Sequence, residues 1–168
     1  MKTTYKNIIY LLFIGVMMQS LNANGNVVRS LILPGWGELN MKKTKSAKIL
    51  MTSDISIMVT YLLGKSLNGW YVDQYTAYGA LYADADMGGK DYSFIVNMSN
   101  YDSMSEYDQD MSNQKFFDDI YNNPDYNWQW DSTKKRLKFN DMRESSIVSE
   151  KFAEFAVAGL IISRLVSV

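Results

Sequence analysis

The sequence contains no cysteine and no histidine among its 168 residues. Without these residue types, disulfides, the usual zinc sites, thiol nucleophiles and histidine-based triads cannot be built. The absence of cysteine also excludes a lipid-modified cysteine at the start of an exported chain. Stability must therefore come from burial, from a bilayer or from partners.

The motifs of common enzyme classes are missing too. There is no G-x-S-x-G, no Walker P-loop and no Rossmann glycine pattern. Two acid-rich stretches approach a calcium loop, but Asn113 replaces the turn glycine of one and Ile95 the closing glutamate of the other. The remaining candidates for acid–base chemistry fit a solvated helix better, and they are Asp108, Asp110, Asp118 and Asp119. We predict a protein that is not an enzyme and uses no metal or cofactor.

A strong excess of positive charge is also lacking, since the formal net charge is −1. Nucleic acid is therefore not an expected partner. Between residues 100 and 131, Lys115 is the single base among many carboxylates. This acidic segment predicts a region that is exposed to water.

The N-terminal segment, residues 1–23, has the layout of a secretory signal peptide. Lys2 and Lys6 precede an apolar run from Ile8 to Met18, and polar residues then lead to the small Ala23. The run is shorter than the ~20 residues that a spanning helix needs. We predict that residues 1–23 direct export and are removed, with a retained N-terminal membrane anchor as the alternative.

Two apolar segments in the rest of the chain are predicted to be helices that pack together. In residues 47–67, small residues recur at steps of three or four positions, namely Ser53, Ser56, Thr60 and Gly64. The closing helix, predicted over residues 145–168, repeats this spacing with Ala156, Gly159 and Ser163. Small residues on one face let two helices approach closely. A lone charge in apolar surroundings is costly, so Arg164 is predicted to pair with Asp54 or Glu154.

A sharp turn, Pro34-Gly35-Trp36-Gly37, precedes the first of these helices. Proline stops a helix, and glycine permits tight backbone geometry. The indole of Trp36 suits a membrane interface. The lysines that follow are interpreted either as a solvated loop or as the anionic-lipid side of a membrane, and they are Lys42, Lys43, Lys45 and Lys48.

Aromatic residues are frequent in the middle of the chain. Residues 68–85 are predicted as an amphipathic, tyrosine-rich helix, and residues 92–96 as a short extended piece. A polar helix is expected over residues 104–121, starting at the capping box of Ser103 and Glu106. Tyr126, Trp128 and Trp130 alternate and would project to one side of an extended segment. They are predicted either to pack on the fold or to form a recognition surface.

The segment Ser30–Glu38 (SLILPGWGE), followed by lysines and an apolar helix, resembles an uncharacterised bacterial family called domain of unknown function 5683. Residues 101–103 and 128–131 fit the polar middle of that family, and Arg143–Val168 fits its closing helix. Glu38 stands where the family has glutamine. The family's closing helix continues further, so we expect a truncated C-terminus. The resemblance implies a small envelope protein with membrane-associated helices and no established catalytic residues.

These patterns predict a mostly α-helical protein whose residues 24–168 form one membrane-associated domain. Residues 24–85 hold the turn and first helices, residues 86–131 a polar insertion, and residues 132–168 a basic entry and the final helix. The expected function is a non-enzymatic structural or complex-forming component of a bacterial envelope membrane, inner or outer. Membrane lipids and other envelope proteins are the expected partners. The alternative is a soluble periplasmic or secreted binding module with Tyr126, Trp128 and Trp130 as its contact surface.

Overall fold

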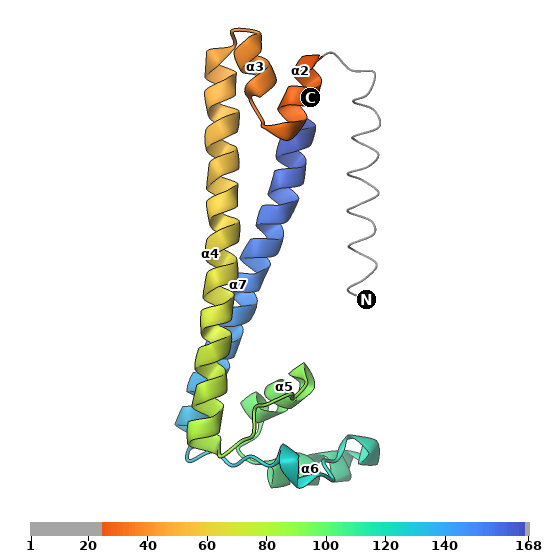
Figure 1. Cartoon of the computed structure of the whole chain (residues 1–168). Helices are drawn as coiled ribbons and strands as arrows, with labels where there is room; N and C mark the ends of the chain where they lie inside the picture. The colour runs from red at the N-terminus through yellow and green to blue at the C-terminus, as the bar shows by residue number, and fades with distance from the viewer. Residues whose placement is uncertain (1–24, 167–168) are drawn as a thin grey trace. The chain divides into compact units, whose positions relative to one another are not determined.

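The computed structural model describes residues 25–166, which fold mostly into helices (Figure 1). The signal-peptide prediction for residues 1–23 lies outside the described residues. No strand occurs within residues 25–166, where Ser103 and Gln129 form an isolated antiparallel bridge. The prediction of a mostly α-helical fold is confirmed. The elements are α2 (Gly25–Ile32), α3 (Trp36–Asn40), α4 (Thr44–Ala83), α5 (Tyr92–Asn100), α6 (Met104–Gln114), the 3-10 turns η1 (Phe117–Asp119) and η2 (Pro124–Tyr126), and α7 (Thr133–Val166).

The chain divides into two compact units. The first unit comprises the described residues up to Leu62 together with those from Ala153 onward, and the second comprises Leu63–Phe152. Helices α4 and α7 each contribute residues to both units. The units therefore do not follow the segment boundaries that we expect from composition after residues 85 and 131.

Helix α4 covers both of the helices predicted over residues 47–67 and 68–85. The predicted boundary between residues 67 and 68 does not occur, since the helix continues through it. The side-chain amide of Asn68 donates to the carbonyl of Ser146 on α7 at 2.9 Å. The polar side chain next to the predicted boundary thus makes a tertiary hydrogen bond and does not end the helix.

Helix α5 replaces the extended piece predicted at residues 92–96, so that prediction is wrong. Asp91 caps the helix, since its carboxylate accepts a hydrogen bond from the Phe94 backbone N–H at 3.0 Å. Phe94, Ile95 and Met98 are buried. Their spacing puts them on one helical face, and burial of that face overrides the β-propensity of the local sequence.

Helix α6 begins as predicted and ends earlier. The Ser103 hydroxyl accepts from the Glu106 N–H at 3.1 Å, and the Glu106 carboxylate accepts from the Asp102 N–H at 2.7 Å. The helix stops at Gln114 because Lys115 adopts the left-handed conformation, with φ 63°.

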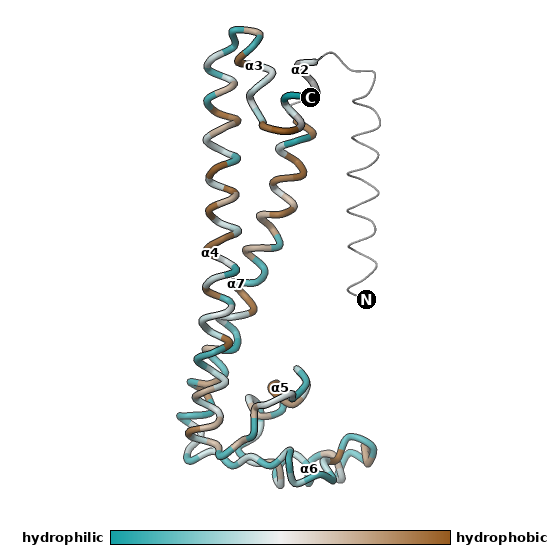
Figure 2. The backbone as a smooth tube through the Cα atoms, viewed as in Figure 1, coloured by the Kyte–Doolittle hydropathy of each residue, from teal (hydrophilic) through white to brown (hydrophobic). Residues whose placement is uncertain are grey.

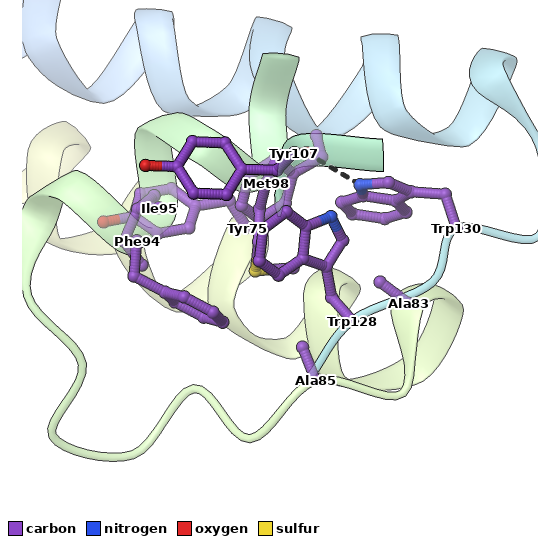
Figure 3. Close-up of a cluster of buried hydrophobic side chains, with 10 residues drawn as sticks. Tyr75, Ala83, Ala85, Phe94, Ile95, Met98, Tyr107, Trp128 and Trp130 are labelled. Carbon is purple, nitrogen blue, oxygen red and sulfur yellow. Dashed lines mark hydrogen bonds between the residues drawn. The ribbon is translucent and has the colours of Figure 1, made fainter. Parts of the chain in front are cut away.

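The core of the second unit is a cluster of aromatic rings (Figure 3). The rings of Phe94 and Trp128 meet edge to face with centroids 5.4 Å apart, and both side chains are fully buried. Trp130 packs on Phe139 of α7 with centroids 5.0 Å apart, and its indole N–H donates to the Met98 carbonyl at 2.7 Å. The edge-to-face pair of Phe94 and Trp128 adds to the energy of burial. The cluster ties α5 and α7 to the extended segment that precedes α7.

Candidate functional site

A partly buried ion pair joins α4 and α7 within the first unit. Arg164 donates to both carboxylate oxygens of Asp54, with an Nη1–Oδ1 distance of 2.6 Å and an Nη2–Oδ2 distance of 3.3 Å. The side chain of Asp54 is 5% exposed and that of Arg164 is 26% exposed. Of the two acids considered from the sequence, Asp54 is the partner of Arg164, whereas Glu154 is exposed.

Small residues of α7 face α4 here, as predicted. Ala156 is buried, and a side chain added at Gly159 would meet Ile57 of α4 at 3.5 Å. The Ser163 hydroxyl lies 3.4 Å from Asp54 Oδ1. The two helices run antiparallel in this unit, because residue 54 contacts residue 164 and residue 57 contacts residue 159.

The small-residue face predicted for α4 is wrong in its position. Ser53, Ser56 and Thr60 are exposed, and only Gly64 is buried. Consecutive residues of a helix point about 100° apart. A helix that turns Asp54 toward Arg164 therefore turns Ser53 away. The face that meets α7 in the first unit runs through Asp54 and Ile57.

Apolar residues, drawn in brown, are frequent in the first part of α4 and the last part of α7 (Figure 2), and many of their side chains are exposed on the outward surface of this helix pair. Phe155 is 72% exposed and Ile49 is 69% exposed. Further exposed apolar side chains are Ile55, Met58, Val59 and Leu62 on α4 and Ile162, Leu165 and Val166 on α7. Water-soluble monomers rarely expose so much apolar surface in one place. Among the residues searched, α4 is the one helix whose length and composition suffice to cross a membrane.

The predicted turn is present between α2 and α3 and packs against the start of α4. Pro34 is fully buried. Gly35 has φ 86°, and a Cβ at this position would lie 2.6 Å from the Ala47 carbonyl oxygen. Only glycine meets both conditions without strain. Trp36, in contrast, is 42% exposed.

Hydrogen bonds of Ser30 fix the same turn. Its hydroxyl accepts from the backbone N–H of Gly37 at 3.1 Å and donates to a carboxylate oxygen of Glu38 at 3.2 Å. Ser30 and Gly37 are both buried. Much of the Ser30–Glu38 segment thus has a structural role at this turn.

The predicted contact surface of Tyr126, Trp128 and Trp130 is wrong for the two tryptophans, because both are buried. The indole N–H of Trp128 donates to the Tyr101 carbonyl at 3.2 Å. Tyr126 is half-buried and packs on Phe94 with ring centroids 5.4 Å apart. The alternation of aromatic residues therefore reflects packing toward the interior of the second unit.

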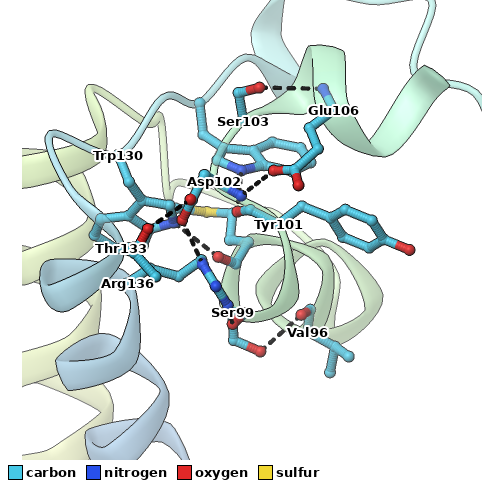
Figure 4. Close-up of polar contacts among 11 residues, drawn as sticks. Val96, Ser99, Tyr101, Asp102, Ser103, Glu106, Trp130, Thr133 and Arg136 are labelled. Atoms are coloured by element: carbon cyan, nitrogen blue, oxygen red, sulfur yellow. Dashed lines mark hydrogen bonds and ion pairs between the residues drawn. The ribbon is translucent and has the colours of Figure 1, made fainter. Parts of the chain in front are cut away.

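Asp102 connects the loop before α6 to the first turns of α7 (Figure 4). Its carboxylate accepts from Arg136 Nε at 2.6 Å and from the Thr133 hydroxyl at 2.7 Å. Arg136 also donates to the Ser99 carbonyl at 2.9 Å. Desolvation raises the pKa of Asp102, but the two hydrogen bonds and the charge of Arg136 outweigh it and hold the pKa below its ordinary value. The acid is thus committed to a structural ion pair.

Two tyrosines of the second unit have unusually high pKa values. The Tyr101 hydroxyl donates to Asp110 Oδ2 at 2.6 Å, and this hydrogen bond to a carboxylate is the main reason why its pKa rises from 10.0 to about 12. Burial is the main reason why the pKa of Tyr121 also rises to about 12. Both tyrosines are therefore held in the neutral form by the fold.

These shifts predict alkaline destabilisation of the second unit. A pKa raised by folding stabilises the fold fully below pH 10 and loses this contribution as pH rises toward about 12. We expect the free energy of unfolding to fall over this range, measured by urea titrations at successive pH values. Tyr101→Phe/Tyr121→Phe is expected to flatten the decline. Phe94→Leu serves as a control, since it lowers stability without removing a titrating group. An unchanged slope in the double variant would contradict the assignment.

No group of acidic side chains able to hold a metal ion occurs within the described residues. No family model, curated protein or solved structure matches this chain. The resemblance drawn from the Ser30–Glu38 segment therefore stays a prediction.

The sequence did not predict, among other contacts, those of Ser30 with Glu38, Gly35 with Ala47, and Asp102 with Arg136. The sequence gives a weak indication of the contact between Ser30 and Glu38, since a serine and an acid flank the predicted turn. The other two join residues that have no regular spacing. Asp54 could have indicated which face of α4 meets α7, because a charge that needs a partner is turned toward the neighbouring helix.

Proposed function

We propose that this protein is a non-enzymatic, membrane-associated component of the bacterial cell envelope, with the helix pair of its first unit in lipid. The observation that carries this proposal is that the distribution of charged and apolar side chains is the reverse of that in a water-soluble protein. The ion pair of Asp54 and Arg164 lies inside, and large apolar side chains lie outside. In water, each exposed side chain of this size lacks the roughly 1.5–3 kcal/mol of stabilisation that its burial would give. In hydrocarbon, charges directed at a neighbouring helix are the expected arrangement.

The exposed hydroxyl groups of α4 support the same proposal. Ser56 donates to the Thr52 carbonyl and Thr60 to the Ser56 carbonyl, both at 2.9 Å. A hydroxyl that bonds to its own helix needs no water and is compatible with a lipid environment.

The length of the apolar stretch also fits a membrane, at its lower limit. Residues 49–64 carry Asp54 as their single charge, and as a helix they extend roughly 24 Å, compared with a hydrocarbon core of about 30 Å. Lys48 and Lys65 flank the stretch, and such side chains extend to the headgroups. The antiparallel pairing puts Glu154 near the level of Leu62, at one end of the stretch.

The second unit is proposed to work in the aqueous phase. Its segment of residues 100–131 is rich in acids, and Glu106, Asp118, Asp119 and Asp125 are exposed. Phe116 and Phe117 are also exposed, and they support the proposal that this unit contacts other envelope proteins.

Membrane retention of the full chain tests the proposal. We expect the wild-type protein to stay with the membrane fraction after alkaline carbonate washing and to need detergent for release. Ile55→Lys puts a charge on the outward apolar surface, where Ile55 is 63% exposed. We expect it to weaken insertion roughly 100-fold, since a lysine at a helix centre costs about 2.5–3.5 kcal/mol in a bilayer.

Leu81→Lys is the matched control. Leu81 is also an aliphatic residue of α4, 70% exposed, but it belongs to the second unit. We expect this variant to stay in the membrane fraction like the wild type. Release of the wild-type protein by carbonate, with solubility in the absence of detergent, would overturn the proposal.

A further inference from the structure

We infer that the basic end of the first unit, defined as residues 36–48, binds the anionic headgroups of phospholipids. This inference rests on the proposed function and adds the class of lipid that the protein selects. The basic end consists of α3, the loop after it and the first turn of α4.

The positive charge of the basic end has little to neutralise it within its own segment. All of its lysines are exposed, and they are Lys42, Lys43, Lys45 and Lys48. Glu38 is the only acid in the sequence from residue 25 to residue 53. It is half-buried and accepts a hydrogen bond from Ser30. The local excess of positive charge therefore favours an anionic partner.

The backbone that carries these lysines is well defined. Lys42 adopts the left-handed conformation with φ 61°, and its N–H donates to the Leu39 carbonyl at 3.0 Å. The N–H of Lys43 donates to the Glu38 carbonyl at 2.8 Å. Close packing of Gly35 on Ala47 holds the preceding turn. The turn thus fixes the backbone positions of the lysines and leaves their side chains exposed.

Exposed apolar side chains on the same segment favour a lipid over other anions. Trp36 and Leu39 are each 42% exposed, and Met41 is 48% exposed. Tryptophan and aliphatic side chains beside lysines are typical of segments at the boundary between headgroups and acyl chains. A soluble phosphate or a nucleic acid would leave these apolar side chains in water. The outward apolar surface of the first part of α4 follows directly along the chain.

Lipid enrichment in a mixed bilayer tests the inference. The full chain is placed in nanodiscs of phosphatidylcholine with about one third phosphatidylglycerol, and the lipids that remain bound after mild detergent release are counted by native mass spectrometry. An anionic surface attracts each nearby lysine by an amount equivalent to roughly a fivefold change in affinity. We expect phosphatidylglycerol to be enriched about fivefold over the bulk at low ionic strength and to lose most of this enrichment at high ionic strength.

Two variants with the same change in net charge complete the design. Replacing Lys42, Lys43, Lys45 and Lys48 with Gln should abolish the enrichment. Replacing the exposed Lys115, Lys134, Lys138 and Lys151 with Gln should leave it in place. Equal enrichment in wild type and in the first variant would overturn the inference, as would wild-type enrichment no greater than the bulk. In either case, incorporation into the nanodisc would leave the proposed function standing. Failure of the wild type to incorporate would overturn both.

Discussion

Replacing Arg164 with leucine is expected to destabilise the first unit by about 3–5 kcal/mol, because it leaves a nearly buried carboxylate without its counter-charge. The side chain of Asp54 is 5% exposed, and both of its oxygens accept from Arg164. The Ser163 hydroxyl, 3.4 Å from Oδ1, is too distant to replace a guanidinium. The measurement is the loss of helical circular dichroism during denaturation of the full chain in detergent micelles.

A double variant separates the net contribution of the ion pair to stability from the cost of leaving one charge without its partner. Asp54→Leu/Arg164→Leu removes both charges, and we expect it to recover most of the lost stability, since apolar replacements of buried pairs are often neutral. Glu154→Leu is the control, because this acid of the same helix is exposed. Wild-type stability in the Arg164→Leu variant would show that Asp54 does not depend on this partner.

Replacing Trp128 with alanine is expected to destabilise the second unit by about 3–5 kcal/mol, the usual cost of deleting a large buried ring. Trp128 is fully buried, and its ring meets Phe94, Tyr107 and Tyr121 at centroid distances of 5.4, 6.1 and 5.8 Å. Its indole N–H also satisfies the Tyr101 carbonyl. Urea unfolding, followed by near-ultraviolet circular dichroism of the aromatic cluster, measures the change.

Trp70→Ala is the matched control for this prediction, since Trp70 lies on α4 and is 54% exposed. We expect it to change stability by less than about 0.5 kcal/mol. Trp128→Phe keeps most of the ring but loses the hydrogen bond, so an intermediate cost of about 1–3 kcal/mol is expected. If Trp128→Ala leaves the unfolding curve unchanged, Trp128 is not part of the core.

The same variants bear on the alternative function of a binding module. A surface formed by Tyr126, Trp128 and Trp130 would require rings that a ligand can reach. In the structure, the indole N–H groups of both tryptophans donate to backbone carbonyls inside the second unit. Any loss of binding in a Trp128 variant would therefore follow from loss of folding, which the stability measurement detects.

Several features of the fold follow from short-range sequence patterns. The turn at Pro34 and Gly35, the capping box of Ser103 and Glu106, and the helical nature of the apolar segments are all present in the structure. Each depends on residues at most a few positions apart, where backbone geometry and local hydrogen bonds decide the outcome. The continuity of α4 and the end of α6 are less predictable, because Asn68 inside α4 makes a tertiary contact and Lys115 after α6 adopts the left-handed conformation although it is not glycine.

The sequence by itself determined the helical class, the sharp turn and the need for Arg164 to find an acid, since spacing, capping and the cost of a lone charge are local properties. Only the tertiary structure decided that Asp54 rather than Glu154 meets Arg164, that Ser53 faces outward, and that Trp128 and Trp130 face inward. The physical reason is that a helical or alternating pattern defines faces but not which face meets a neighbour. That choice depends on contacts between residues far apart in the chain, such as Asp54 with Arg164 and Phe94 with Trp128.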